Sequence, residues 1–182
     1  SQFDRPNGIA VQGDLLFIVE RDNHRVQVLQ LPDFKPLGVF AAGDLRKPYG
    51  LWVNPAQGGY DVYVTDSYDD GEDAAGNDIL PALERLNERV RRYHVEVGDG
   101  TVQARLVRSI GDTSAKGALR VVESIWGDPA NDRLLVAEED ETYASEFKVY
   151  TLAGDFTGNT FGNGMFTSVD VALIVPIAME EK

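Results

Sequence analysis

The sequence contains no cysteine, only two histidines and only two methionines. The lack of cysteine excludes disulfide bonds, thiolate metal ligands and a cysteine nucleophile. The histidines, His24 and His94, lie on separate expected strands, so they predict neither a metal cluster nor a Ser-His-Asp triad and are expected to be structural. No apolar run approaches the roughly 20 residues that span a bilayer, and the longest, residues 169–178, contains Asp170 and Pro176. A membrane partner is therefore not expected.

Basic residues are scarce relative to acidic ones. The chain of 182 residues has 17 lysines and arginines against 30 aspartates and glutamates, a net charge of −13. Such a field disfavours a nucleic-acid backbone and attracts cations. The same charge also serves solubility. The composition therefore predicts an acidic globular protein with no nucleic-acid partner.

One sequence pattern recurs along the chain. Each copy has a short apolar segment, a spacer, and a second apolar segment that ends in acidic residues. The copies lie at residues 6–28, 48–67 and 123–139. Short strands repeated every 40–50 residues or so are typical of propeller blades. We therefore predict an all-β propeller segment of about three four-stranded blades.

The expected boundaries treat residues 1–182 as a single partial propeller domain. Blade 1 covers about residues 1–45, blade 2 about 46–115, blade 3 about 116–162, and residues 163–182 are the remnant of a fourth blade. An insertion in blade 2, residues 69–92, begins with an acidic stretch. Apolar residues spaced by three and four then predict a short helix within residues 79–92. These are Leu80, Leu83, Leu86 and Val90.

A three-bladed segment leaves sheet edges and half of a central channel uncovered, because closed propellers typically have four to eight blades. Two outcomes are physically acceptable. Either two copies associate as a homodimer that closes a six-bladed ring under twofold symmetry, or the chain is part of a longer protein. We expect self-association.

The three repeats place an acidic residue at the same blade position, just after the second strand: Glu20, Asp66 and Glu138. Ring symmetry gathers such positions around one axis, where carboxylates repel one another unless a cation lies between them. Hard oxygen ligands suit Ca²⁺, and Glu139 adds a fourth carboxylate. The alternative is that each carboxylate accepts hydrogen bonds within its own blade, from turn amides or from a basic residue such as Arg25.

Two further sets of residues are weighed in the same way. Arg21, Arg25 and Lys148 are candidates for binding a phosphorylated ligand, although pairing with the excess carboxylates is the simpler role. The acidic residues 69–73 lack the ligand spacing of an EF-hand loop, so a solvated loop is favoured over a calcium site. No catalytic residue can be named from the sequence.

The segments Gly8-Ile9-Ala10-Val11 and Asn23-His24-Arg25-Val26-Gln27-Val28 resemble an NHL repeat, a blade type of six-bladed propellers. Blades 2 and 3 also resemble bacterial propellers related to the calcium-dependent β-propeller phytases, through residues 63–68, 86–93, 136–141 and 147–150. This resemblance implies calcium binding, phosphomonoester hydrolysis and a secreted or periplasmic location. Two acidic motifs of phytases proper are missing. The resemblance therefore leaves two functions open: a calcium-dependent phosphoric monoester hydrolase, or a non-catalytic NHL-type module that binds a protein or carbohydrate.

Overall fold

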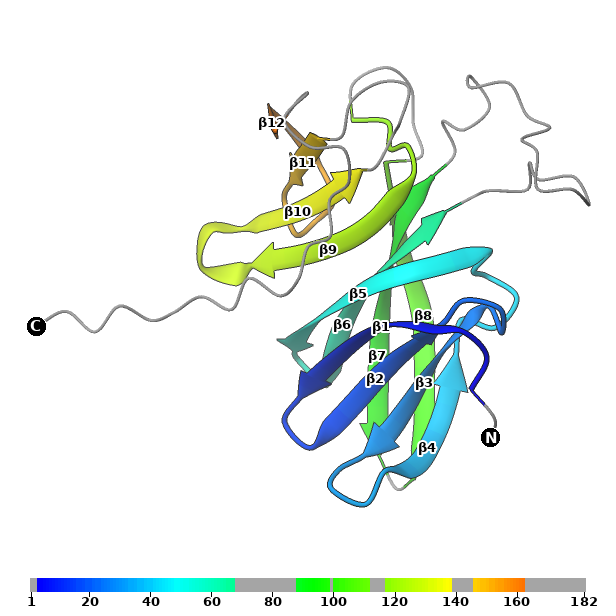
Figure 1. Ribbon diagram of the computed structural model, residues 1–182. Coiled ribbons are helices and arrows are strands. Elements are labelled where there is room, and N and C mark those ends of the chain that lie inside the picture. Colours follow the sequence, from blue (N-terminus) through cyan, green and yellow to red (C-terminus); the bar gives the residue numbers. More distant parts are fainter. Residues whose placement is uncertain (1–2, 68–87, 99, 112–116, 139–145, 163–182) are drawn as a thin grey trace, which may run out of the picture.

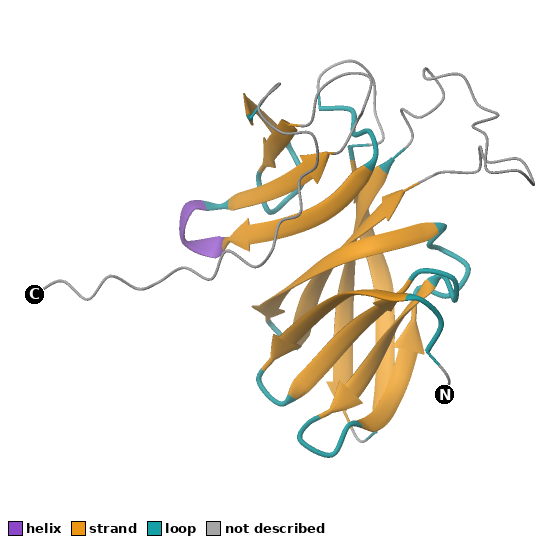
Figure 2. Cartoon of the chain, viewed as in Figure 1, coloured by secondary structure: helices purple, strands orange, loops and turns teal. Residues whose placement is uncertain are grey.

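A computed structural model describes residues 3–67, 88–98, 100–111, 117–138 and 146–162. These residues form three antiparallel sheets of four strands each, and in every sheet the strands are neighbours in chain order. Figures 1 and 2 show the sheets side by side, with blade 2 between the other two. The prediction of a partial propeller with three four-stranded blades is confirmed.

Each blade runs from an inner strand, which lies next to the inner strand of the following blade, to an outer strand. Blade 1 consists of β1 (Pro6–Gln12), β2 (Leu15–Glu20), β3 (Arg25–Gln30) and β4 (Lys35–Phe40). Blade 2 consists of β5 (Lys47–Ala56), β6 (Gly59–Ser67), β7 (Arg89–Gly98) and β8 (Thr101–Ile110). Blade 3 consists of β9 (Val122–Asp128), β10 (Arg133–Glu138), β11 (Glu146–Tyr150) and β12 (Phe156–Phe161), with a 3-10 turn, η2 (Pro129–Asn131), between its first two strands.

The last residues of the segment in which a helix was expected form a strand instead. Residues 89–92 belong to β7, where Val90 is buried and pairs with Thr65 on one side and Ile110 on the other. The apolar spacing that suggested a helix counted Val90, which instead belongs to the alternating pattern of a strand. The rest of the expected insertion, up to residue 87, lies outside the described residues. In the described part of the chain, no helix is long and apolar enough to cross a membrane.

Alternate residues of each strand point to opposite sides of the blade. We call the side toward the following blade the forward face and the side toward the preceding blade the backward face. The forward face of blade 1 packs on the backward face of blade 2 to form the first core. Its buried members are Leu15, Phe17, Val19, Val26, Val28, Phe40, Leu45, Leu51, Val53, Val62, Val64, Tyr93 and Val95.

A second core joins blade 2 to blade 3 in the same way. Its buried members are Tyr63, Val90, Ile110, Leu119, Val122, Leu134, Val136 and Tyr150. Trp52 packs across Gly127, where an added Cβ would collide with the indole ring. The Tyr63 hydroxyl donates to the Leu152 carbonyl at 2.9 Å. Trp52 and Tyr63 therefore pack between blades 2 and 3.

Glycine allows the inner strands to approach at backbone distance. A Cβ on Gly8 would lie 2.6 Å from the carbonyl oxygen of Tyr49, and one on Gly50 would lie 2.6 Å from that of Glu123. Gly8 and Gly50 occupy the same position, two residues after the prolines that start β1 and β5. The second approach is fixed by Thr65, whose hydroxyl accepts from the Gly50 N–H at 2.7 Å and donates to the Glu123 carbonyl at 3.1 Å.

We expect Gly50→Ala to destabilise the protein by about 1–3 kcal/mol, because the neighbouring carbonyl is backbone and cannot rotate away. Gly98→Ala is the matched control, since a Cβ there meets no atom within 4 Å. Urea unfolding of both variants measures the difference. Equal stability of the two variants would show that the inner strands are not held at this distance.

Candidate functional site

The three acidic residues singled out in the sequence occupy equivalent places in the structure. Each lies at or next to the end of the second strand of its blade, on the backward face, and each is at most 3% exposed. Glu20 pairs across the sheet with Pro6, Asp66 with Pro48, and Glu138 with Val122. The inner strands are irregular beside these pairs. The sequence repeat therefore identified a true structural repeat.

In blade 1, Glu20 binds groups of its own blade. Its Oε2 accepts from Arg25 Nε at 2.6 Å, and its Oε1 accepts from Asn23 Nδ2 at 2.7 Å and from the Asp4 N–H at 3.3 Å. Burial opposes ionisation of this carboxyl, but the donors prevail and hold the pKa of Glu20 below its ordinary value. Glu20 is therefore an ionised, internally paired group.

In blade 2, Asp66 accepts from two backbone N–H groups, those of Arg46 at 2.7 Å and Lys47 at 3.2 Å. The Nε atoms of Arg89 and Arg91 lie 3.5 and 3.9 Å from its Oδ2. Burial raises the pKa of Asp66, and these N–H donors and guanidinium groups only partly offset that effect. Asp66 is thus enclosed by the chain entering β5 and by the start of β7.

In blade 3, Glu138 accepts from the Arg120 N–H and forms a 2.6 Å ion pair with Lys148. The Lys148 ammonium also donates to the Ala118 carbonyl at 2.5 Å and lies 3.5 Å from Glu146. Burial raises the pKa of Glu138, and the lysine offsets only part of the rise. The pattern of the first two blades is repeated with lysine in place of arginine.

The three sites share one structural function. Asp4, Arg46 and Arg120 each lie two residues before the β-pairing partner of the acid that binds them. Each carboxylate therefore accepts a hydrogen bond from the chain that leads into its own inner strand, while a cation from the third strand balances the charge. We call this arrangement the carboxylate clamp. It matches the alternative in which these acids act within their own blades.

The structure does not bring the clamp acids together as a ligand set. Within the described ranges, no three histidine, cysteine, aspartate or glutamate side chains are grouped so that they could hold a metal ion. Glu139, the fourth expected ligand, lies outside the described residues, as does the acidic stretch 69–73. Calcium binding by Glu20, Asp66, Glu138 and Glu139 therefore stays a prediction.

The candidate phosphate ligands separate into two groups. Arg25 and Lys148 are the cations of the clamps in blades 1 and 3. Arg21 lies on the turn after β2, and its guanidinium carbon is 4.6 Å from the centroid of the Tyr49 ring on β5. Of the three, Arg21 is the one whose charge is directed to an aromatic ring on the neighbouring blade.

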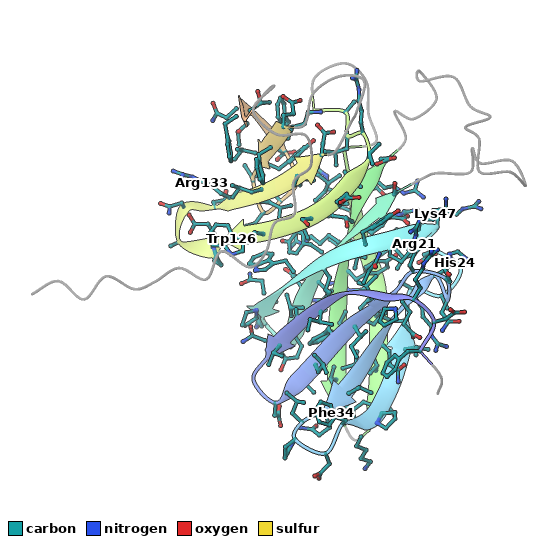
Figure 3. The ribbon with its side chains drawn as sticks, in the orientation of Figure 1. Arg21, His24, Phe34, Lys47, Trp126 and Arg133 are labelled. Carbon is teal, nitrogen blue, oxygen red and sulfur yellow. The ribbon has the colours of Figure 1, made fainter. Side chains whose placement is uncertain are left out.

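Arg21 belongs to a basic and aromatic group at the end of blades 1 and 2 where the clamps lie. His24 Nδ1 contacts the Arg46 carbonyl, which links the two blades. Figure 3 shows Arg21, His24 and Lys47 together at this end, with Phe34 at the opposite end of blade 1. We call Arg21, His24, Arg46, Lys47 and Tyr49 the rim patch.

Sequence reasoning missed two buried polar groups. Glu88 accepts from the Val122 N–H and forms an isolated bridge with Leu119, so it ties blade 2 to blade 3. Asp61 lies 2.7 Å from Arg92 and 3.2 Å from His94. Glu88 stands at the position of His24, which likewise reaches the start of the next blade, but the two side chains differ in chemistry, so the repeat did not indicate the role of Glu88. The pairing of Asp61 with His94 is consistent with the structural role expected for that histidine.

The family model for the NHL repeat matches residues 3–29, which span β1–β3. The chain has the fold of a partial β-propeller, and its first blade matches the NHL repeat. Among solved structures, it is similar to a chain of the "Crystal structure of Nidogen/Laminin Complex" at a TM-score of 0.56 and 17% identity. That match covers 86% of this propeller and 46% of the other chain, so the propeller spans less than half of its neighbour. The search of curated proteins gave no match.

Glu20 and Glu138 have the same ordinary pKa, 4.5, but are shifted in opposite directions. A carboxyl group whose pKa is lowered in the native protein adds stability that is lost as the pH falls through that native pKa. A carboxyl group whose pKa is raised in the native protein adds stability that is lost as the pH rises through that native pKa. Between about pH 7 and the ordinary pKa, lowering the pH should therefore increase the stabilisation that Glu138 gives over Glu138→Gln. The stabilisation that Glu20 gives over Glu20→Gln should instead shrink as the pH falls below its ordinary pKa.

Urea unfolding of the wild type and both variants, from about pH 7 to below the ordinary glutamate pKa, measures the two trends. The glutamine variants are matched controls for each other, because each removes one charge from an equivalent position. Trends of the same sign would contradict the two environments described for these acids.

Proposed function

We propose that this propeller is a non-catalytic binding module whose rim patch contacts a protein partner. The proposal rests on one observation: four of the candidate ligands already form ion pairs with one another inside their own blades. Glu20 and Glu138, offered as calcium ligands, are paired with Arg25 and Lys148, offered as phosphate ligands. A calcium-dependent hydrolase would have to break these buried ion pairs before it bound metal or substrate. A binding module can leave them intact.

The rim patch has the composition of a protein-binding surface. Arginine and tyrosine are enriched among residues that dominate binding energy, and here they are held together by a cation–π contact between two blades. Because Arg21 and Tyr49 come from different blades, their relative position is fixed by the packing of the first core. Such preorganisation reduces the entropy lost on binding.

Charge favours an acidic segment as the partner. The chain carries a net charge of −13, yet the rim patch combines two arginines and a lysine with a histidine. Cationic side chains gathered on an otherwise acidic protein favour contact with an acidic partner. The structural neighbour's title names a complex between nidogen and laminin, so the neighbour comes from an assembly between proteins. That neighbour supports the class of function and not the identity of a partner.

A peptide-display selection on the immobilised protein tests the proposal. We expect selected peptides to be acidic, and we expect Arg21→Ala and Tyr49→Ala each to weaken their binding at least about tenfold. Phe34→Ala is the matched control, because Phe34 is an exposed aromatic residue at the opposite end of blade 1. Fluorescence polarisation with a labelled selected peptide gives the affinities. Equal binding by wild type and both rim variants would contradict the proposed surface.

The competing hydrolase function is separated by two measurements on the same protein. Calcium bound only by the native state would raise the melting temperature, and an active hydrolase would release phosphate from phytate or p-nitrophenyl phosphate. A calcium-dependent rise that Glu138→Gln abolishes, together with phosphate release, would replace the binding-module proposal with the hydrolase. Neither effect is expected while the clamps hold.

A further inference from the structure

The chain contains two contacts between successive blades, and both are built in the same way. In both, the forward face of one blade covers the backward face of the next with apolar side chains. Blade 1 also has a backward face, and blade 3 also has a forward face. These two faces belong to the same chain and are of the two kinds that pack together elsewhere in it.

The inner strand of blade 1 exposes apolar residues on its backward face. Ile9 and Val11 on β1 are 67% and 59% exposed, whereas Leu51 and Val53, at the same positions on β5, are 7% and 6% exposed. Val39 on the outer strand β4 is 41% exposed on the same face, whereas Ile18 and Leu29 on the two strands between them are 7% and 4% exposed. The difference between β1 and β5 arises because blade 1 covers β5. Neighbouring exposed apolar residues such as Ile9 and Val11, at positions that are buried in blade 2, are candidates for an interaction site.

The forward face of blade 3 carries the complementary apolar group. Trp126 pairs across the sheet with Leu135, and Phe147 pairs and stacks with Phe161 at a centroid distance of 4.8 Å. Trp126, Leu135 and Phe147 are partly exposed, and Phe161 is 48% exposed. Trp126 stands where Trp52 stands in blade 2, and Trp52 covers the next inner strand.

We propose that a second copy of this chain covers both faces, so that the forward face of blade 3 in each protomer packs on the backward face of blade 1 in its partner. Twofold symmetry makes the two contacts identical and closes a ring of three plus three blades, within the four to eight blades typical of propellers. The contact resembles the first core, because apolar residues meet on both sides. This association does not depend on the rim patch or its partner.

Steric details make the new contact wider than the internal ones. Ser124 occupies the position of Gly8 and Gly50, where a Cβ would approach the next inner strand to 2.6 Å. Trp126 would meet Val11 of the partner protomer, whereas Trp52 meets Gly127, which has no side chain. The contact between protomers is therefore looser than a contact within the chain. It should dissociate on dilution while each protomer stays folded.

Sedimentation or light scattering across a dilution series measures this association. We expect the wild type to have twice the chain mass of 20.0 kDa at high concentration and the single mass at low concentration. Val11→Asp should raise the dissociation constant at least about tenfold, which corresponds to about 1.4 kcal/mol. Val107→Asp is the matched control, because Val107 is an exposed valine on β8, away from both faces, and should leave the constant unchanged.

A variant that should strengthen the association of the two copies is a sharper test than one that should weaken it. Ser124→Gly removes the Cβ at both contacts of the ring, so we expect it to lower the dissociation constant. Glycine within a strand lowers the stability of the protomer itself. Tighter association of a less stable protomer would therefore show that the substitution acts on ring closure and not on folding. A wild type of single mass at all concentrations would overturn the proposal. A dimer that neither Val11→Asp nor Ser124→Gly alters would also overturn it, because other surfaces would then hold the copies together.

Discussion

The structure depends on how closely one inner strand can approach the next. Gly8 and Gly50 let β1 reach β5 and β5 reach β9 at backbone distance, and the forward face of each blade then meets the backward face of the following one. Without that approach, the valines of blade 1 would not cover Leu51 and Val53, and Trp52 would not cover Gly127. Apolar burial between sheets, which is the main favourable term in folding, is therefore controlled by a few positions that cannot carry a side chain.

The carboxylate clamps solve a problem that this packing creates. The chain enters each inner strand through a residue whose N–H is not part of the sheet's regular hydrogen bonds, and a buried N–H without an acceptor is costly. Glu20, Asp66 and Glu138 supply the acceptor from the neighbouring strand. An acid in this position is useful to a propeller whether or not the propeller binds a cation. The end of the ring where such acids gather therefore does not by itself indicate a metal site.

Sequence alone predicted the architecture well, because strand alternation and the repeated Pro-x-Gly-apolar start are local signals. It failed at Val90, which continues the apolar spacing of the expected helix but belongs to a strand whose partners lie far away in the sequence. It also placed the three acids at equivalent positions. The sequence named Arg25, which does bind Glu20, but the particular backbone donors could not be chosen, since N–H groups such as that of Arg120 are the same for every residue type except proline. Glu88 was missed because the equivalent position in blade 1 is a histidine, His24, so residue type did not reveal that this position joins successive blades.

The clamp is tested most directly by amide hydrogen exchange at Arg46 and Arg120, which lie just before the inner strands β5 and β9. Their N–H groups donate to Asp66 and Glu138 instead of to a sheet neighbour. Both amides should be protected in the native protein, and Asp66→Ala, which removes the acceptor, should accelerate exchange at Arg46 and not at Arg120. Exchange of both amides at the rate of an unstructured peptide would contradict the clamp.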